Sequence, residues 1–136
     1  MKNKLIGLDT NIFIYYFHQH DHFGLPAKKI FTQLANNKIK AVTSVITSIE
    51  LLSFKRSEKE IVELKDFLLE ISNLTISDLT NDIAIEAARI RRDYGFRLPD
   101  SVQLATSLSK KATRFLTNDV RLKKFKELEV VLLENF

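Results

Sequence analysis

The chain has 136 residues, of which 45% are hydrophobic and 28% charged, with only 3 glycines and 2 prolines. This composition predicts a single globular domain, residues 1–136, built from regular helices and strands, and it excludes a disordered chain. The absence of cysteine excludes disulfides and thiolate metal sites. Because no apolar run reaches roughly 18 residues and no secretory leader is recognisable, we expect a cytoplasmic protein without a membrane span.

The formal net charge is +4, but the basic residues are concentrated in one part of the sequence. From Arg89 to Lys126 there are 11 lysines and arginines against three aspartates, a balance of +8, whereas the rest of the chain carries −4. Such a basic region is typical of a protein with a polyanionic partner. Solvated helix faces rich in lysine and arginine produce the same pattern, so charge alone leaves both interpretations open.

The first half of the chain predicts alternating strands and helices. Residues 4–8 form an apolar segment typical of a buried strand, and residues 10–17 predict a short helix that begins at polar residues able to cap it. Apolar residues at helical spacing predict a second helix over residues 26–35, and a strand follows over residues 40–44. Another helix comes directly after this strand, and its predicted core face consists of Ile46, Ile49 and Leu52.

The second half repeats this alternation. Ser57 and Glu60 have the spacing of a capping box at the start of a helix over residues 57–71. The remaining predicted elements, in chain order, are a strand over 74–76, a helix over 81–93 ended by Gly95, a helix from Leu98, a strand over 114–116, a short basic helix through Lys126 and a strand over 130–133. Strands that alternate with helices predict an α/β protein with a mostly parallel sheet of about five strands, covered by helices on both faces.

Three histidines and an aspartate lie close together after the first helix: His18, His20, Asp21 and His22. Imidazole is the commonest ligand of transition metals in proteins, so this segment is a candidate metal site. The residues alternate within a polar stretch just before Gly24, and that context favours an exposed loop without a metal.

Four acidic residues occupy positions that can converge in a parallel sheet. Asp9 and Asp119 follow predicted strands, Glu50 lies in the helix after the second strand, and Asp100 opens the helix before the fourth. The carboxyl ends of parallel strands share one edge, where ligands bind. Clustered carboxylates repel one another, and a divalent cation relieves that repulsion; an all-oxygen set of ligands suits Mg²⁺ or Mn²⁺. Taken singly, Glu50 reads as a helix-surface residue and Asp100 as one that complements a helix dipole.

These residues resemble the motifs of a known family. Asp9-Thr10-Asn11, Glu50, Asp100 and Thr117-Asn118-Asp119 follow one another at separations of 41, 50 and 19 residues between the acids. Their order and placement resemble the PIN domain, a nuclease fold, and are most similar to the short VapC-type toxins of prokaryotic type II toxin-antitoxin systems. One departure is Ser101, where relatives more often have alanine after the matching aspartate.

The resemblance implies a three-layer α/β/α sandwich and a metal-dependent endoribonuclease that acts as a toxin. It further implies that Mg²⁺ or Mn²⁺ is bound by a catalytic set of four acids, with three supporting residues beside them. The acids are Asp9, Glu50, Asp100 and Asp119, and the supporting residues are Thr10, Asn11 and Thr117. The implied partners are an RNA substrate, a cognate antitoxin protein and a second copy of the chain in a homodimer.

Two other functions fit parts of the sequence. A PIN-like module could bind RNA or protein without catalysis, although all four acids are present. An aspartyl-phosphate protein also uses an aspartate after its first strand, but the dehalogenase pattern requires a second aspartate where this chain has Asn11, and a receiver domain requires an acidic pair that is absent, with Asp78 as its only candidate acceptor. Since no Ser, Cys or His is paired with a base as a nucleophile, the sequence favours attack by a water that the metal activates.

Overall fold

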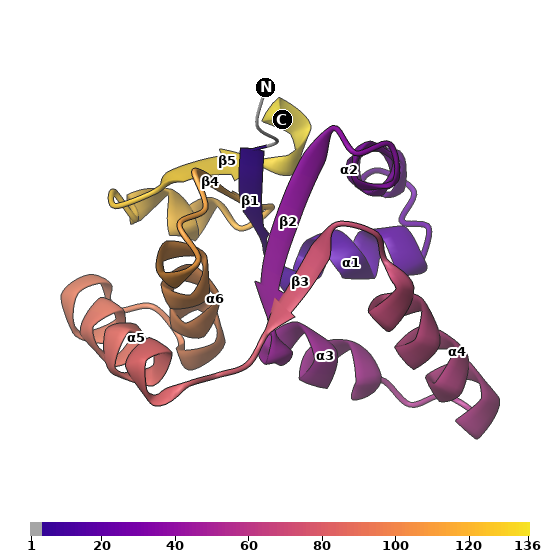
Figure 1. Cartoon of the computed structure of the whole chain (residues 1–136), viewed down its shortest axis with the longest axis horizontal. Coiled ribbons are helices and arrows are strands. Elements are labelled where there is room, and N and C mark those ends of the chain that lie inside the picture. The colour runs from indigo at the N-terminus through magenta and orange to yellow at the C-terminus, as the bar shows by residue number, and fades with distance from the viewer. Residues whose placement is uncertain (1–3) are drawn as a thin grey trace.

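Five parallel strands form the central sheet of the computed structural model, which describes residues 4–136 (Figure 1). The strands lie in the order β3-β2-β1-β4-β5, and every neighbouring pair is parallel. Their bounds are β1 Lys4–Leu8, β2 Ile39–Ser44, β3 Leu74–Ser77, β4 Arg114–Thr117 and β5 Glu129–Leu132. The predicted α/β fold, a parallel sheet of about five strands within a three-layer α/β/α sandwich, is confirmed.

Within the described residues, six α-helices and two short 3₁₀ helices connect the strands and cover both faces of the sheet. The helices are α1 Thr10–Phe17, α2 Gly24–Ala35, α3 Val45–Leu52, α4 Glu58–Glu70, α5 Asn81–Tyr94, α6 Leu98–Ser109, η1 Val120–Lys124 and η2 Leu133–Asn135. Figure 1 shows α5 and α6 on one side of the sheet and α1 to α4 on the other. Within residues 4–136, none of the helices combines the length and hydrophobicity that crossing a bilayer requires.

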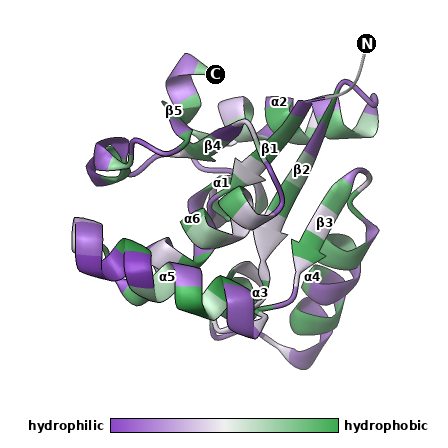
Figure 2. Cartoon of the chain, turned by 60° about the vertical axis from the view of Figure 1, so that its left-hand side comes forward, coloured by the Kyte–Doolittle hydropathy of each residue, from purple (hydrophilic) through white to green (hydrophobic). Residues whose placement is uncertain are grey.

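Two hydrophobic cores result from the alternation of side chains along the strands. Ile6 and Leu8 of β1 join Leu116 of β4 in the core beneath α1, α2 and α4. Phe115, the residue before Leu116, points to the other face and joins the core beneath α5 and α6. The strands are therefore buried on both faces, as is typical of parallel sheets. Figure 2 shows the matching pattern in the helices, where hydrophobic and hydrophilic residues alternate along α4 and α5.

Gly7 allows α6 to pack closely against the middle of β1. A Cβ atom at this position would lie 1.9 Å from the Ser107 hydroxyl oxygen, which is closer than any real contact. The absence of a side chain at Gly7 therefore brings α6, and with it the N-terminal turn that carries Asp100, near the centre of the sheet.

Local sequence signals account well for the ends of the helices. The Ser57 side chain accepts the amide of Glu60, whose carboxylate returns to the Ser57 amide, so the predicted capping box is present at α4. Gly95 ends α5 in the left-handed conformation with φ of 73°. The larger differences from the predicted ends are that α2 begins at Gly24, two residues early, and that the basic helix η1 ends at Lys124; the ends of α4 and α5 shift by one residue at most.

The prediction for the core face of α3 is wrong at Ile49, which is 59% exposed, whereas the other two residues of the predicted face are partly buried against the cores. The fully buried residues of this helix are Thr47 and Leu51. The Thr47 hydroxyl lies 2.6 Å from that of Thr43 and accepts a hydrogen bond from the Gln103 amide at 2.8 Å. Because polar partners from β2 and α6 satisfy it, a threonine faces the interior where the apolar pattern predicted isoleucine.

The connections place a topological switch point between β1 and β4. The chain moves from β1 outward to β2 and β3, and then crosses back through α5 and α6 to β4 on the other side of β1 (Figure 1). In open α/β sheets, ligands bind beyond the carboxyl ends of the strands at such a point. Asp9 directly follows β1, and Asp119 lies two residues after β4.

Candidate active site

Asp9 lies at the centre of the candidate site, at the end of β1. Its side chain is 7% exposed and caps α1 by accepting the Thr10 amide at 2.9 Å. The second carboxylate oxygen accepts the Thr117 hydroxyl at 2.6 Å, which connects β1 to the end of β4. A buried carboxylate with two donors is thus fixed in orientation by the two central strands.

Glu50 reaches the same site from α3 through Thr10. The Thr10 hydroxyl donates to Glu50 Oε1 at 2.7 Å, and its backbone amide is the one that binds Asp9. Thr10 therefore binds two carboxylates: its amide binds that of Asp9 at the end of β1, and its hydroxyl binds that of Glu50, 40 residues away in sequence. The supporting position predicted for Thr10 agrees with these contacts.

Asp119 joins the site through Thr117. The Asp119 amide donates to the Thr117 hydroxyl at 3.0 Å, the same hydroxyl that binds Asp9. The Nδ2 of Asn11 lies 3.5 Å from this hydroxyl, while its Oδ1 is buried without a hydrogen-bond partner in the described part of the chain. Thr117 and Asn11 are thus next to the acids, as predicted, and the free Asn11 oxygen is an additional acceptor there.

Asp100 opens α6 as a buried residue of its first turn. Its Oδ2 accepts the Arg97 Nε at 3.1 Å and lies 3.8 Å from an Arg121 nitrogen. Arg121 also binds both carboxylate oxygens of Asp119, with Nε to Oδ1 at 3.0 Å. The two aspartates therefore share one guanidinium, which connects the N-terminus of α6 to the start of η1.

Burial and like charges raise the pKa of Asp9 to about 6. Burial is the largest cause, and the nearby Asp100 and Glu50 carboxylates raise the pKa further, against the lowering effect of the hydrogen bonds from Thr117 and Thr10. Arg121 has the opposite effect on Asp119, since its hydrogen bonds lower the pKa of that carboxyl. The structure thus brings the four predicted acids together and leaves the negative charge of Asp9 uncompensated.

The donor set of this site fits a divalent cation. The four acids offer carboxylate oxygens, the ligands that Mg²⁺ and Mn²⁺ prefer. The buried Asp9 carboxylate has two neutral donors and no ion pair within residues 4–136, and the Asn11 oxygen has no hydrogen-bond partner there. Within residues 4–136, no three acidic or histidine side chains are already arranged to enclose an ion. Oxygens of Asp100 and Asp119 are instead held by hydrogen bonds from Arg97 and Arg121.

A buried polar network beneath the acids was missed by the sequence analysis. Gln103 of α6 is 2% exposed, and its amide donates to the hydroxyls of Thr10 at 3.0 Å and Thr47 at 2.8 Å. Its carbonyl oxygen accepts the Ser44 hydroxyl at 2.9 Å. Gln103 therefore fixes Thr10, which in turn binds Glu50. The available signal was a glutamine directly before the apolar residues Leu104 and Ala105 of this helix.

A family model described as PIN domain matches residues 6–128 of the chain. The chain belongs to the PIN domain family. Metal-dependent ribonuclease activity is the usual function of this family. The family resemblance predicted from the spacing of the four acids is therefore confirmed, and the match includes all of them. The search of curated proteins gave no match.

Solved structures of other chains share the fold of this PIN domain. A chain of VapBC2 from Rickettsia felis, bound to a DNA fragment from its promoter, is 19% identical with a TM-score of 0.74, covering 94% of this chain and 98% of that chain. A toxin-antitoxin complex from Klebsiella pneumoniae gives 25% identity and a TM-score of 0.67, with coverage of 96% and 98%. DNA-bound VapBC from Salmonella typhimurium gives 18% and 0.73, with coverage of 97% and 99%.

The histidines of this PIN domain form no metal cluster among the described residues. His20 Nδ1 accepts the backbone amides of His22 and Phe23, both at 3.1 Å, so it organises the turn before α2. His18 Nε2 lies 2.9 Å from a guanidinium nitrogen of Arg56. The segment is largely exposed, in agreement with the loop that its sequence context favoured.

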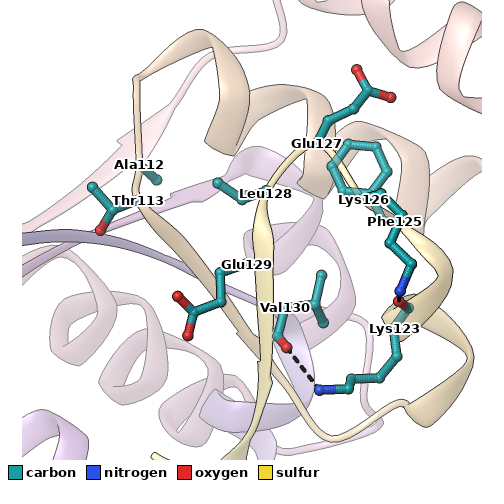
Figure 3. A pocket seen from close by; sticks show the side chains of 9 residues that line it. All are labelled: Ala112, Thr113, Lys123, Phe125, Lys126, Glu127, Leu128, Glu129 and Val130. Atoms are coloured by element: carbon teal, nitrogen blue, oxygen red, sulfur yellow. Dashed lines mark hydrogen bonds between the residues drawn. The ribbon is translucent and has the colours of Figure 1, made fainter.

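The basic region divides into residues that stabilise the fold and residues at the site. Arg89 binds carboxylates on and beyond α5, and Lys123 donates to the Val130 carbonyl at 3.2 Å. Figure 3 shows Lys123 beside a cavity of about 540 Å³ at the amino ends of β4 and β5. None of the four acids lines this cavity. Arg97 and Arg121 are the members of the region that contact the acids.

Proposed function

We propose that the chain is a metal-dependent endoribonuclease, the toxin of a type II toxin-antitoxin system, which cuts RNA phosphodiesters at the site around Asp9. The observation that carries this proposal is the buried Asp9 carboxylate, with a pKa raised to about 6 beside Asp100 and Glu50. Such a strongly perturbed acid is typical of a functional site. Membership in the PIN domain family supplies the reaction class.

In this proposal, Asp9, Glu50 and Asp100 hold Mg²⁺ or Mn²⁺ directly or through water, and Asp119 completes the set. When bound, the cation stabilises the charge that develops on the phosphate and lowers the pKa of a water molecule. The chain's own residues provide the orientation: Thr117 and the Thr10 amide fix Asp9, and the Thr10 hydroxyl fixes Glu50. Arg97 and Arg121 lie at the same site, where a guanidinium can position an RNA phosphate.

The solved structures support the biological part of the proposal. They are toxin-antitoxin complexes, two of them bound to DNA, and they match nearly the whole length of this chain. By the same similarity we propose a cognate antitoxin and a homodimer as partners, and the cytoplasm, where RNA and antitoxin are present, as the place of action.

The proposal is tested by incubating the purified chain, freed of any antitoxin, with structured RNAs and Mg²⁺ or Mn²⁺. We expect endonucleolytic cleavage that EDTA abolishes and that Asp9→Asn reduces by about 10³-fold, because it removes several kcal/mol of transition-state stabilisation. Asp78→Asn is the matched control, since Asp78 is exposed and lies outside the site; it should cut like the wild type. Absence of metal-dependent cleavage, or equal rates for Asp9→Asn and the wild type, would contradict the proposal.

A further inference from the structure

Arg121 is attached to the acidic site more loosely than its number of contacts suggests. It binds Asp119 with two nitrogens and reaches Asp100 at 3.8 Å, yet its side chain is 55% exposed. Arg97, the second arginine on Asp100, is 64% exposed. Their carboxylate partners are more buried, with Asp100 8% and Asp119 20% exposed, but both guanidinium groups face water, and this exposure limits how much the ion pairs contribute to stability. The arginines can therefore leave the acids without disturbing the fold.

The oxygens that Arg121 binds are among those that the proposed cation needs. Arg121 engages Oδ1 and Oδ2 of Asp119, and its terminal nitrogen lies near Oδ2 of Asp100. A divalent cation carries twice the charge of a guanidinium and coordinates carboxylate oxygens directly. Occupation of the same oxygens by both is unfavourable, since the two cations repel each other at this distance. Metal and Arg121 therefore compete for the site.

Once displaced, Arg121 remains beside the site because its backbone is fixed. Its amide donates to Asp119 Oδ1 at 3.0 Å, and Leu122, the next residue of η1, is fully buried. The planar guanidinium matches a phosphate group with two parallel hydrogen bonds, and the partly exposed side chain leaves room for that ligand. An RNA phosphate drawn to the metal would meet this freed guanidinium.

We propose that Arg121 is a resident counter-ion of the acidic site, which a divalent cation displaces from Asp119 and Asp100 and which then binds a phosphate of the RNA substrate. This inference rests on the proposed function, because it requires both the metal and the RNA. It assigns one residue two successive roles: it compensates the acids before the metal binds and positions the substrate afterwards.

The first test measures Mn²⁺ affinity by isothermal titration calorimetry without RNA. Arg121→Gln should bind Mn²⁺ about two- to fivefold more tightly than the wild type, the range set by the loss of one exposed competing ion pair. Lys124→Gln removes the same charge from the same short helix, and the Lys124 side chain makes no ion pair with residues 4–136. Its Mn²⁺ affinity should equal that of the wild type. Arg121→Lys, which keeps the charge without the planar fork, should lie between the wild type and Arg121→Gln.

The second test measures the affinity for a single-stranded DNA, which carries the same phosphates as RNA but is not cut by a ribonuclease, by fluorescence anisotropy with and without Mn²⁺ and over a range of salt concentrations. In the wild type, Mn²⁺ should increase the affinity and steepen the dependence of log K on log salt by about 0.7, the value for one additional phosphate contact on a single strand. In Arg121→Gln, the slope should not change on addition of Mn²⁺.

The outcomes separate this inference from the proposed function. Equal Mn²⁺ affinities for Arg121→Gln, Lys124→Gln and the wild type overturn the counter-ion role and leave the nuclease proposal intact. A salt slope that steepens equally in Arg121→Gln overturns the substrate role. A wild-type chain that binds no Mn²⁺ overturns both the metal-dependent function and the inference built on it.

Discussion

Two clusters of charged side chains, one around Arg89 and one around Asp9, differ in how their charges are balanced. In the first, the Arg89 guanidinium contacts three carboxylates, those of Glu86, Asp93 and Glu127, and every member is at least 31% exposed. Arg89 lowers the pKa of Glu127, which also accepts the Tyr94 hydroxyl at 2.8 Å. This cluster connects α5 to the segment before β5, and its charges stabilise one another.

In the cluster around Asp9, by contrast, the central carboxylate has no oppositely charged partner among the described residues. The arginines of this cluster contact Asp100 and Asp119, whereas Asp9, which is as buried as Asp100, is held by neutral donors alone. Its pKa is consequently raised, while that of Glu127 is lowered. Both clusters contain arginines and carboxylates, but they differ in the burial of their acids and in the direction in which the pKa of Asp9 and that of Glu127 shift. A buried acid with a raised pKa is typical of a functional site, whereas an exposed ion-pair network stabilises the fold.

The largest expected effect on stability comes from Asp9→Asn. The folded-state pKa of about 6 exceeds the ordinary value of 3.8, so the folded state holds this proton more tightly, and Asp9 costs stability progressively as the pH rises from 4 to 6. In EDTA at pH 8, Asp9→Asn should therefore raise the free energy of unfolding by on the order of 2–3 kcal/mol, with little change at pH 4.

Urea denaturation at the two pH values measures this difference. Asp78→Asn, an identical change at an exposed position, should alter stability by less than about 0.5 kcal/mol at both. Two outcomes would contradict this expectation: a stability gain for Asp9→Asn that does not depend on pH, or a loss of stability at pH 8. Either result would mean that the charge of Asp9 does not destabilise the fold, and the two clusters would then not differ in how their charges are balanced.

The next largest effect, of opposite sign, is a loss of stability for Gln103→Ala, which tests whether neutral hydrogen bonds hold the site. The change leaves buried hydroxyls of Thr10, Thr47 and Ser44 without the partner that Gln103 supplies, and should lower the free energy of unfolding by about 1–3 kcal/mol. Because Thr10 also orients Glu50, RNA cleavage should fall about tenfold or more. Unchanged cleavage in a folded Gln103→Ala protein would limit Gln103 to a structural role.

The smallest effect is expected for Glu127→Gln in the Arg89 cluster. Its ion pair with Arg89 is partly exposed, so the change should lower the free energy of unfolding by less than about 1 kcal/mol. The lowered pKa of Glu127 means that this contribution is present above the ordinary value of 4.5 and is lost as the pH falls through the lower folded-state value. Thermal denaturation at pH 7 and at pH 3, without added denaturant, measures the stability difference between Glu127→Gln and the wild type. An effect on RNA cleavage would contradict the structural assignment of this cluster.

Elements with strong local signals were predictable from the sequence almost to the residue. The observed bounds of α1 match the prediction, and α4 and α5 begin and end where the Ser57 capping box and Gly95 placed them. The face of α3 was not predictable, because the burial of Thr47 depends on Gln103, 56 residues away in sequence. Tertiary partners decide such positions, and the apolar pattern of a short helix contains no information about them.

The sequence predicted which acids belong to the site, but it predicted few of the contacts that hold them in place. The parallel sheet explains why Asp9 and Asp119 meet, since both follow central strands. The hydrogen bond from Thr10 to Glu50 could not be predicted from the sequence, because it joins residues that are 40 positions apart. Arg97 and Arg121 lie three residues before Asp100 and two after Asp119, so their pairing with these acids had a local signal that charge counting over the whole basic region concealed.

Whether the acids of four separate segments form one metal site is decided by Mn²⁺ titration of the antitoxin-free chain by isothermal calorimetry at pH 8. We expect the wild type to bind Mn²⁺ and Asp9→Asn to weaken this binding by about tenfold or more, since even residues that only support a ligand change metal affinity by that factor. Equal Mn²⁺ affinity in Asp9→Asn and the wild type would contradict this prediction.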